Sequence, residues 1–195
     1  MENLRTAETL SVRQKKEWGE ILTGFESRNR YAVSDSSGRE VYLAAEESSL
    51  LARLFLKVMR PFSMHILSPE GRAVLRAEKP FRFYFHEISV LTAEGAALGR
   101  VVREFSLLEK KFRVFDAQGM ELYSIRAPLL HPWTFTISRS GLEAGKITKN
   151  WSGLGKEVFT DADNFSVEFP SEDPVERKGL LLGALFLIDL VYFEK

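Results

Sequence analysis

The last part of the chain contains the stretch LLLGALFLIDLVYF (Leu180–Phe193), whose only charged residue is Asp189. A helix of this length rises about 1.5 Å per residue and spans about 21 Å, whereas a bilayer core is about 30 Å thick and needs roughly 20 residues. The stretch is short for a membrane span, and Asp189 would be costly in hydrocarbon. Because a helix that is apolar on all sides must be buried on all sides, we expect it to be enclosed by the rest of the fold, with a membrane anchor as the alternative.

The enclosing structure is predicted by a pattern that repeats upstream of this helix. Short stretches of alternating apolar and polar residues are separated by polar turns that carry a late glycine, at Gly38, Gly71, Gly95, Gly119 and Gly141. Glycine suits the positive φ that hairpin turns require. Together with their flanking segments, five hairpins predict ten to twelve antiparallel strands. The expected fold is mainly β, a closed antiparallel barrel of about twelve strands that encloses the apolar C-terminal helix.

The length of 195 residues suits one domain. Residues 1–24 are polar with scattered apolar positions, so we expect a flexible or weakly helical N-terminal arm, and we assign residues 25–195 to the barrel domain. Strand alternation fails in Ser48–Met59, where Arg53 and Lys57 are four residues apart. This segment is predicted to be a short basic amphipathic helix, either a connector on the barrel rim or a helix at a membrane surface.

Composition excludes several classes of function. The 27 basic and 27 acidic side chains cancel, so no global field attracts nucleic acid. The chain has no cysteine, which excludes disulfides, thiolate metal sites and a thiol nucleophile. The N-terminus has no apolar stretch typical of a secretory signal. We therefore expect a cytoplasmic protein, peripheral to a membrane.

Sequence signatures of the standard enzyme classes are missing from the chain. There is no G-x-S-x-G elbow, no Walker loop and no H-E-x-x-H pattern. The three histidines, His65, His86 and His131, are isolated from one another in the sequence. We therefore expect a protein that is not an enzyme.

One acidic segment imitates a calcium-binding loop. Asp161, Asp163 and Glu172 occupy positions 1, 3 and 12 of such a loop. Positions 5 and 6, where an EF-hand needs an oxygen ligand and a glycine, are Phe165 and Ser166. The prediction is either a weak calcium site with these three carboxylates as ligands or a purely structural turn before a strand.

Basic residues gather near aromatic residues at two places. Lys146, Lys149 and Lys156 surround Trp151, and a tryptophan beside lysines suits a membrane interface. These four residues are a candidate site for an anionic lipid head group, with a solvated face as the alternative. A second basic cluster contains Arg100, Arg103, Lys110, Lys111 and Arg113.

Several of these segments resemble the phospholipid scramblase family, within the tubby-like and LURP-one-related superfamily. The strongest resemblance is in residues 145–153 (GKITKNWSG), continued by 157–165 (EVFTDADNF) and by Phe169-Pro170. Further similar segments are Asn29–Tyr31, Val41–Glu46, Arg60–Phe62, Lys79–Arg82 and Leu181–Asp189. The resemblance extends from about residue 25 to residue 195. The chain is identified as a minimal member, which suggests a bacterial source.

The resemblance implies a twelve-stranded barrel around a central C-terminal helix, membrane association and calcium-stimulated translocation of phospholipids. This sequence differs from the animal members at a position that matters for membrane attachment. Where they have a palmitoylated cysteine cluster, it has Phe83–Phe85. The expected function is that of a scramblase-like, membrane-associated monomer that translocates lipids or binds a lipid surface. The alternative is a soluble tubby-like module that binds an anionic lipid or a protein partner and translocates nothing. Nucleic acid is not an expected partner.

Overall fold

Side chains along each strand alternate between the inside and the outside of a closed sheet. The computed structural model describes residues 1–15, 29–49, 55–130, 133–150 and 164–194. Within these residues the strands are β1 (Thr9–Gln14), β2 (Arg30–Ser34), β3 (Glu40–Glu47), β4 (Phe62–Leu67), β5 (Ala73–Lys79), β6 (Glu87–Thr92), β7 (Ala97–Glu104), β8 (Glu109–Asp116), β9 (Glu121–Pro128), β10 (Thr134–Arg139), β11 (Leu142–Asn150) and β12 (Asn164–Glu168). The helical elements are α1 (Glu2–Thr6), the 3-10 turn η2 (Lys57–Met59) and α3 (Val175–Tyr192).

The sheet closes into a barrel in which each strand pairs with its neighbours in the sequence. Strand β1 completes the ring, since it pairs antiparallel with β12 on one side and β2 on the other. The predicted fold class is therefore confirmed. In the described part of the expected N-terminal arm, Glu2–Thr6 forms a short helix, but the arm is wrong for residues 9–14, which form a strand of the barrel. Only Leu10 and Val12 face the interior there, and two buried positions make too short a pattern to recognise.

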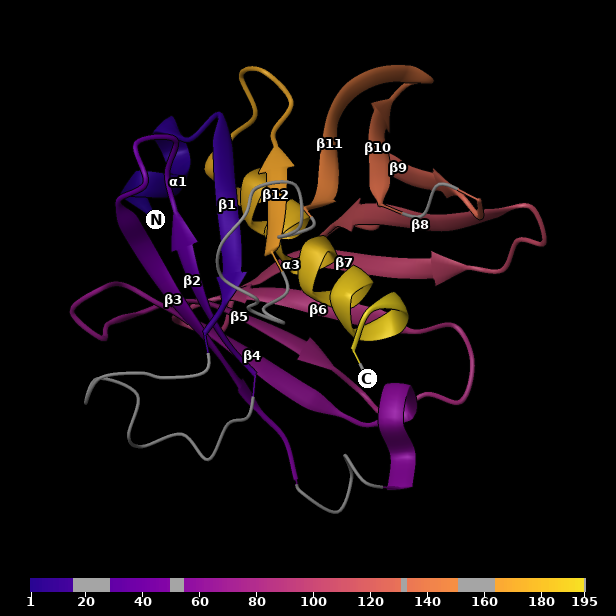
Figure 1. Cartoon of the computed structure of the whole chain (residues 1–195), viewed down its shortest axis with the longest axis horizontal. Helices are drawn as coiled ribbons and strands as arrows, with labels where there is room; N and C mark the ends of the chain where they lie inside the picture. Colours follow the sequence, from indigo (N-terminus) through magenta and orange to yellow (C-terminus); the bar gives the residue numbers. More distant parts are fainter. Residues whose placement is uncertain (16–28, 50–54, 131–132, 151–163, 195) are drawn as a thin grey trace, which may run out of the picture.

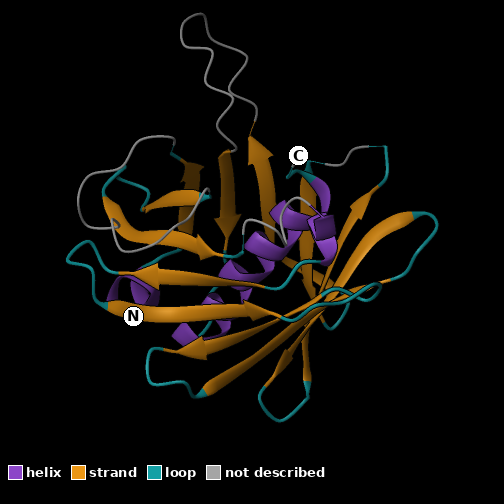
Figure 2. Ribbon diagram, turned by 90° about the horizontal axis from the view of Figure 1, so that it is seen from below, coloured by secondary structure: helices purple, strands orange, loops and turns teal. Residues whose placement is uncertain are grey.

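Helix α3 passes through the interior of the barrel, as Figures 1 and 2 show. Its residues are buried almost continuously from Val175 to Leu190, which confirms the prediction of an enclosed apolar helix. The helix packs closely against the wall at Gly183, where an added Cβ would lie 2.5 Å from Cγ2 of Val90. No helix in the described part of the chain combines the length and apolar character needed to cross a membrane.

The predicted helix over Ser48–Met59 is confirmed only for residues 55–59, since Ser48 and Ser49 are neither helix nor strand. Phe55 and Leu56 are helical and continue into η2. Residues 50–54, which include Arg53, lie outside the described residues.

The two ends of the barrel differ in character. The end that we call the turn end carries the five glycine hairpin turns, each with its glycine at a φ of 81–88°. In four of these turns the glycine N–H donates to the carbonyl three residues earlier, at 2.9–3.1 Å. Helix α3 begins at this end, where Lys178 Nζ donates to the carbonyls of Arg5 and Ala7.

The opposite end, which we call the loop end, carries the other strand connections and the end of α3. The described connections there include residues 80–86 and 105–108, which are neither helix nor strand. Figure 1 shows η2 and the C-terminus together on this side, and Arg60, just after η2, pairs with Glu194 at 2.7 Å. In the described part of the chain, the connections that join one glycine hairpin to the next therefore lie at one end of the molecule.

The enclosed helix gives a direct test of the fold through the substitution Leu187→Lys. Leu187 is fully buried, so an unpaired charge there should lower the free energy of unfolding by several kcal/mol. The matched control is Leu142→Lys, since Leu142 is 75% exposed and should change stability by less than about 0.5 kcal/mol. Chemical denaturation measures both variants. Equal stability of the two would show that α3 is not part of the core.

Candidate functional site

Exposed apolar side chains gather at the loop end. The described part of the chain has thirteen large apolar residues that are exposed, and ten of them are in loop-end connections: Phe55, Phe81, Phe83, Tyr84, Phe85, Phe105, Leu107, Leu108, Leu129 and Leu130. The other three, Met1, Met120 and Leu142, lie at the turn end. We call the ten residues the apolar loop surface. Exposed apolar groups concentrated on one side of a protein mark a surface that meets a membrane or another protein.

The connection between β5 and β6 shows this feature most clearly. Phe83, Tyr84 and Phe85 are 65%, 78% and 66% exposed. Phe85 has a φ of 51°, a conformation that bulky residues rarely adopt. The ring of Phe83 packs edge-on against Phe81 at a centroid distance of 4.9 Å, so the exposed rings are ordered by one another.

Beneath the loops, three cations point into the mouth of the barrel. They are Arg103 on β7, Lys110 on β8 and Lys149 on β11. Each is two positions along its strand from a buried residue, so its side chain faces the interior. We call these three residues the basic mouth. Their charged groups lie over aromatic rings of the last turn of α3, where a cation is attracted to the ring face.

The rings form an aromatic floor under the basic mouth. Lys110 Nζ lies 4.1 Å from the ring centroid of Tyr192 and 5.2 Å from that of Phe193. Lys149 Nζ lies 4.1 Å from the Phe193 centroid, and the Arg103 guanidinium lies 5.2 Å from the Tyr192 centroid. Phe193 is itself wedged among Trp133, Phe135 and Phe165, at centroid distances of 5.6–6.3 Å.

The basic mouth is electrostatically crowded. Burial and the nearby Arg103 guanidinium both lower the pKa of Lys110. Among the described residues no carboxylate oxygen lies within ion-pair distance of Arg103 or Lys110. The carbonyl groups at the C-terminal end of α3 offset part of this charge, because a helix C-terminus carries a partial negative charge.

The opposite side of the mouth holds a buried network in which carboxylates are paired with one arginine. Arg60 lies between Glu46 at 2.9 Å and Glu194 at 2.7 Å, and Asn29 Nδ2 donates to both carboxylates. The hydroxyl of Tyr31 donates to Asp189 at 2.6 Å, which explains how the one charged residue of the apolar stretch is accommodated. Burial and the Asp189 carboxylate raise the pKa of Tyr31, so the phenol keeps its proton.

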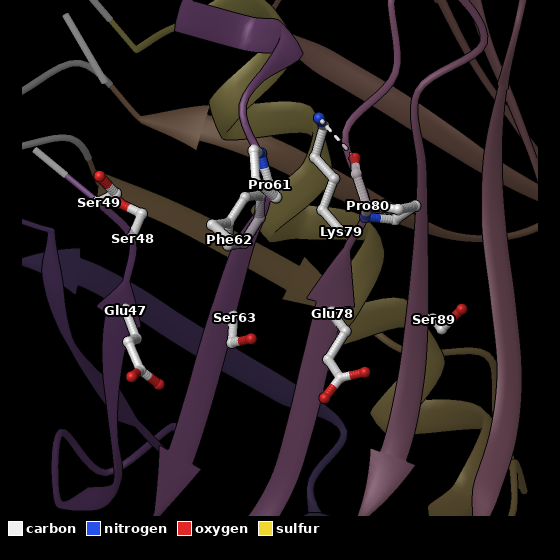
Figure 3. A pocket seen from close by; sticks show the side chains of 10 residues that line it. All are labelled: Glu47, Ser48, Ser49, Pro61, Phe62, Ser63, Glu78, Lys79, Pro80 and Ser89. Atoms are coloured by element: carbon white, nitrogen blue, oxygen red, sulfur yellow. Dashed lines mark hydrogen bonds between the residues drawn. The ribbon is translucent and has the colours of Figure 1, made fainter. Parts of the chain in front are cut away.

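A groove on the outside of the barrel, drawn in Figure 3, is a weaker candidate. Glu47, Ser63, Glu78 and Ser89 lie side by side on β3, β4, β5 and β6, in register across the strands. Glu47 already pairs with His65 at 2.8 Å, and Glu78 pairs with Arg76 at 2.7 Å. No group of three potential metal ligands occurs in the described residues, so this groove supplies no metal site there.

The structure divides the predicted lipid-binding residues. Lys146 faces outward from β11 and pairs with Glu168 at 3.2 Å, whereas Lys149 faces inward over Phe193. Trp151 and Lys156 lie outside the described residues. The sequence interpretation did not associate Lys149 with Arg103 and Lys110. The alternation of side chains along a strand could have predicted that all three face inward, because each is two positions from an apolar residue that is buried.

The predicted calcium ligands are not brought together by the described part of the chain. Glu172 is exposed in the connection between β12 and α3, at the turn end, with a φ of 60°. Asn164, the residue after Asp163, starts β12 at the loop end, and five residues of strand separate the two ends by about 15 Å. Asp161 and Asp163 lie outside the described residues. The structure therefore gives no support to Glu172 as a third ligand.

His86, which is buried near Arg103 and Lys79, gives stability a pH dependence. Burial and the charges of Lys79 and Arg103 lower the pKa of His86 to about 4, from 6.5. Below pH 6.5 the His86 imidazole binds a proton in the unfolded chain but not in the folded protein. The free energy of unfolding therefore falls between pH 6.5 and 4, by up to about 3 kcal/mol. Denaturation of His86→Gln over this range should show a smaller loss. Identical pH dependence in wild type and variant would contradict this assignment.

Comparison with known proteins gives one consistent result. The family model Scramblase matches residues 1–195. Phospholipid scramblase 1 of Rattus norvegicus is 33% identical over the whole chain, which covers 62% of the rat protein. Phospholipid scramblase 2 of Bos taurus is 33% identical and phospholipid scramblase 1 of Homo sapiens 32% identical, with 71% and 65% of those proteins covered. No solved structure matches this chain.

The chain thus spans about three fifths of the length of the rat relative, and the match includes every strand of the barrel and the enclosed helix. The family match agrees with the twelve-stranded barrel and with the residues that carry the resemblance. The protein therefore belongs to the Scramblase family.

Proposed function

We propose that this protein is a scramblase-like, membrane-associated protein that contacts a phospholipid surface with its loop end. One observation carries the proposal: ten of the thirteen exposed large apolar side chains in the described residues lie at that end, above inward-facing cations. The names of the relatives support lipid translocation as the activity. Lipid binding and translocation would proceed without covalent catalysis, and the protein would act as a peripheral membrane monomer in the cytoplasm.

The energetics favour a lipid surface as the partner of the apolar loops. Burial of one exposed Phe or Leu side chain contributes about 1.5–3 kcal/mol, so a few such residues offset the cost of association. Lysine and arginine close to an anionic membrane add about 1 kcal/mol each. Aromatic residues such as Tyr84 suit the interface because one part of the side chain is apolar and the other is polar.

The second candidate function is binding without translocation. An apolar loop surface is also suited to a protein partner, and α3, enclosed by the barrel, has no free apolar face for lipid in the described structure. A vesicle assay that follows fluorescent lipid between leaflets separates the two functions. Lipid transfer between leaflets by the purified protein supports translocation, and membrane binding without transfer supports the binding module.

The apolar loop surface predicts the behaviour of a triple variant, Phe83→Ser with Tyr84→Ser and Phe85→Ser. Removal of three exposed rings should weaken co-sedimentation with vesicles at least about tenfold, because each ring contributes more than 1 kcal/mol on insertion. The control is Met120→Ser with Leu142→Ser at the turn end, which are exposed to a similar extent and should leave binding unchanged. If the control variant lost as much binding as the triple variant, the loop end would not be the membrane-facing end.

Calcium remains part of the proposal, with Asp161 and Asp163 as weak ligands and Glu172 not required. The placement of Glu172 at the turn end motivates this restriction. Calorimetry with millimolar calcium should give a weak signal that Asp161→Asn removes and Glu172→Gln leaves unchanged. Absence of heat in the wild type would remove calcium from the account, and loss of the signal in Glu172→Gln would restore the three-ligand set.

A further inference from the structure

We propose that the basic mouth, formed by Arg103, Lys110 and Lys149, is a site for the phosphate-bearing head group of an anionic phospholipid. The inference rests on the proposed function, because the lipid reaches the mouth from a membrane that the apolar loop surface contacts. It names the class of lipid and the residues that select it. These residues differ from the cluster around Trp151 that the sequence indicated.

The geometry brings the three cations to one place. Arg103 and Lys110 share the ring of Tyr192, and Lys110 and Lys149 share the ring of Phe193. Their charged groups thus lie above two adjacent residues at the end of α3. A phosphate has several acceptor oxygens, so a single phosphate can accept charge-assisted hydrogen bonds from more than one of these side chains.

On β8, the cations on the two faces of the barrel wall differ in whether they form ion pairs. The outward-facing cations, Lys111 and Arg113, both pair with Glu104. The inward-facing Lys110, next to Lys111 in sequence, has no carboxylate within ion-pair distance among the described residues. Since a helix terminus carries only about half an elementary charge, α3 offsets only part of the charge of Arg103 and Lys110.

A buried polar group in the same region also lacks a partner. His86 is 3% exposed, and its Nδ1 makes no hydrogen bond within the described part of the structure. Its backbone carbonyl accepts from the N–H of Arg103 at 2.8 Å, so the imidazole is held beside the basic mouth. A buried nitrogen without a hydrogen-bond partner beside Arg103 fits a site that takes an anionic ligand.

The loop between β7 and β8 indicates a lipid as the source of the phosphate. Arg103 lies at one end of this connection and Lys110 just beyond the other, and Phe105, Leu107 and Leu108 between them are 76–85% exposed. A lipid with its head group at the two cations would have apolar side chains from the same loop beside its acyl chains. A free phosphate ester would gain nothing from these residues.

The test uses neighbouring residues on opposite faces of the barrel wall. On β8, Lys110→Gln removes an inward-facing charge and Lys111→Gln removes an outward-facing one. On β7, Arg103→Gln and Arg100→Gln form the corresponding inward and outward pair. Vesicles of phosphatidylcholine with phosphatidylglycerol, and of phosphatidylcholine alone, are the probes. We expect each mouth variant to lose about tenfold in affinity for the anionic vesicles, as for loss of a charged hydrogen bond, while the outward variants keep wild-type affinity. Thermal melting confirms that all four variants fold.

The outcomes separate this inference from the proposed function. Equal losses in the mouth and outward variants would overturn the head-group site but leave membrane binding by the loop end intact. Wild-type protein that binds neither kind of vesicle would overturn both. A third arm titrates glycerol 3-phosphate: binding to this soluble probe, without binding to vesicles, would contradict a lipid ligand. Selective loss in Lys110→Gln and Arg103→Gln, with retained binding to phosphatidylcholine alone, supports the inference.

Discussion

Burial of α3 on every side is the constraint on which the other features depend. A helix with no polar face is stable in water only if a wall surrounds it, and twelve strands provide that wall. Closure of the ring depends on β1, which joins β12 to β2. Close packing of helix and wall requires a residue without a side chain at Gly183. Within the apolar stretch of the helix, the Asp189 carboxylate accepts a hydrogen bond from the hydroxyl of Tyr31.

Enclosure of the helix also makes the two ends of the barrel different. At the turn end, tight glycine turns and the contacts of Lys178 with Arg5 and Ala7 close the barrel around the start of α3. At the loop end, α3 ends in Tyr192 and Phe193. The mouth is lined by cations on one side and by the carboxylates that pair with Arg60 on the other. Exposed apolar loops surround the same mouth. The proposal that the loop end meets a membrane rests on this asymmetry and on the family membership.

The fold was predictable because its signals are local. The glycine turns and the apolar stretch each appear within a few residues, and both are confirmed. Strand β1 was missed because only Leu10 and Val12 carry its pattern. The basic mouth was found only in part, since Arg103, Lys110 and Lys149 come from strands that pairing, not sequence, brings together. Glu172 matched the spacing of a calcium loop, but a strand separates it from Asn164, and spacing alone cannot reveal that separation.

The central claim is that the loop end faces the membrane, and the absence of cysteine makes it directly measurable. Single spin labels at Leu108→Cys in the loop end and at Leu142→Cys in the turn end would both start from exposed positions, at 85% and 75%. The measurement is the depth of each label in vesicles that contain phosphatidylglycerol. The account predicts that the label at position 108 lies in the hydrocarbon and the label at position 142 in water. A deeper label at position 142, or both labels in water on vesicle-bound protein, would contradict it.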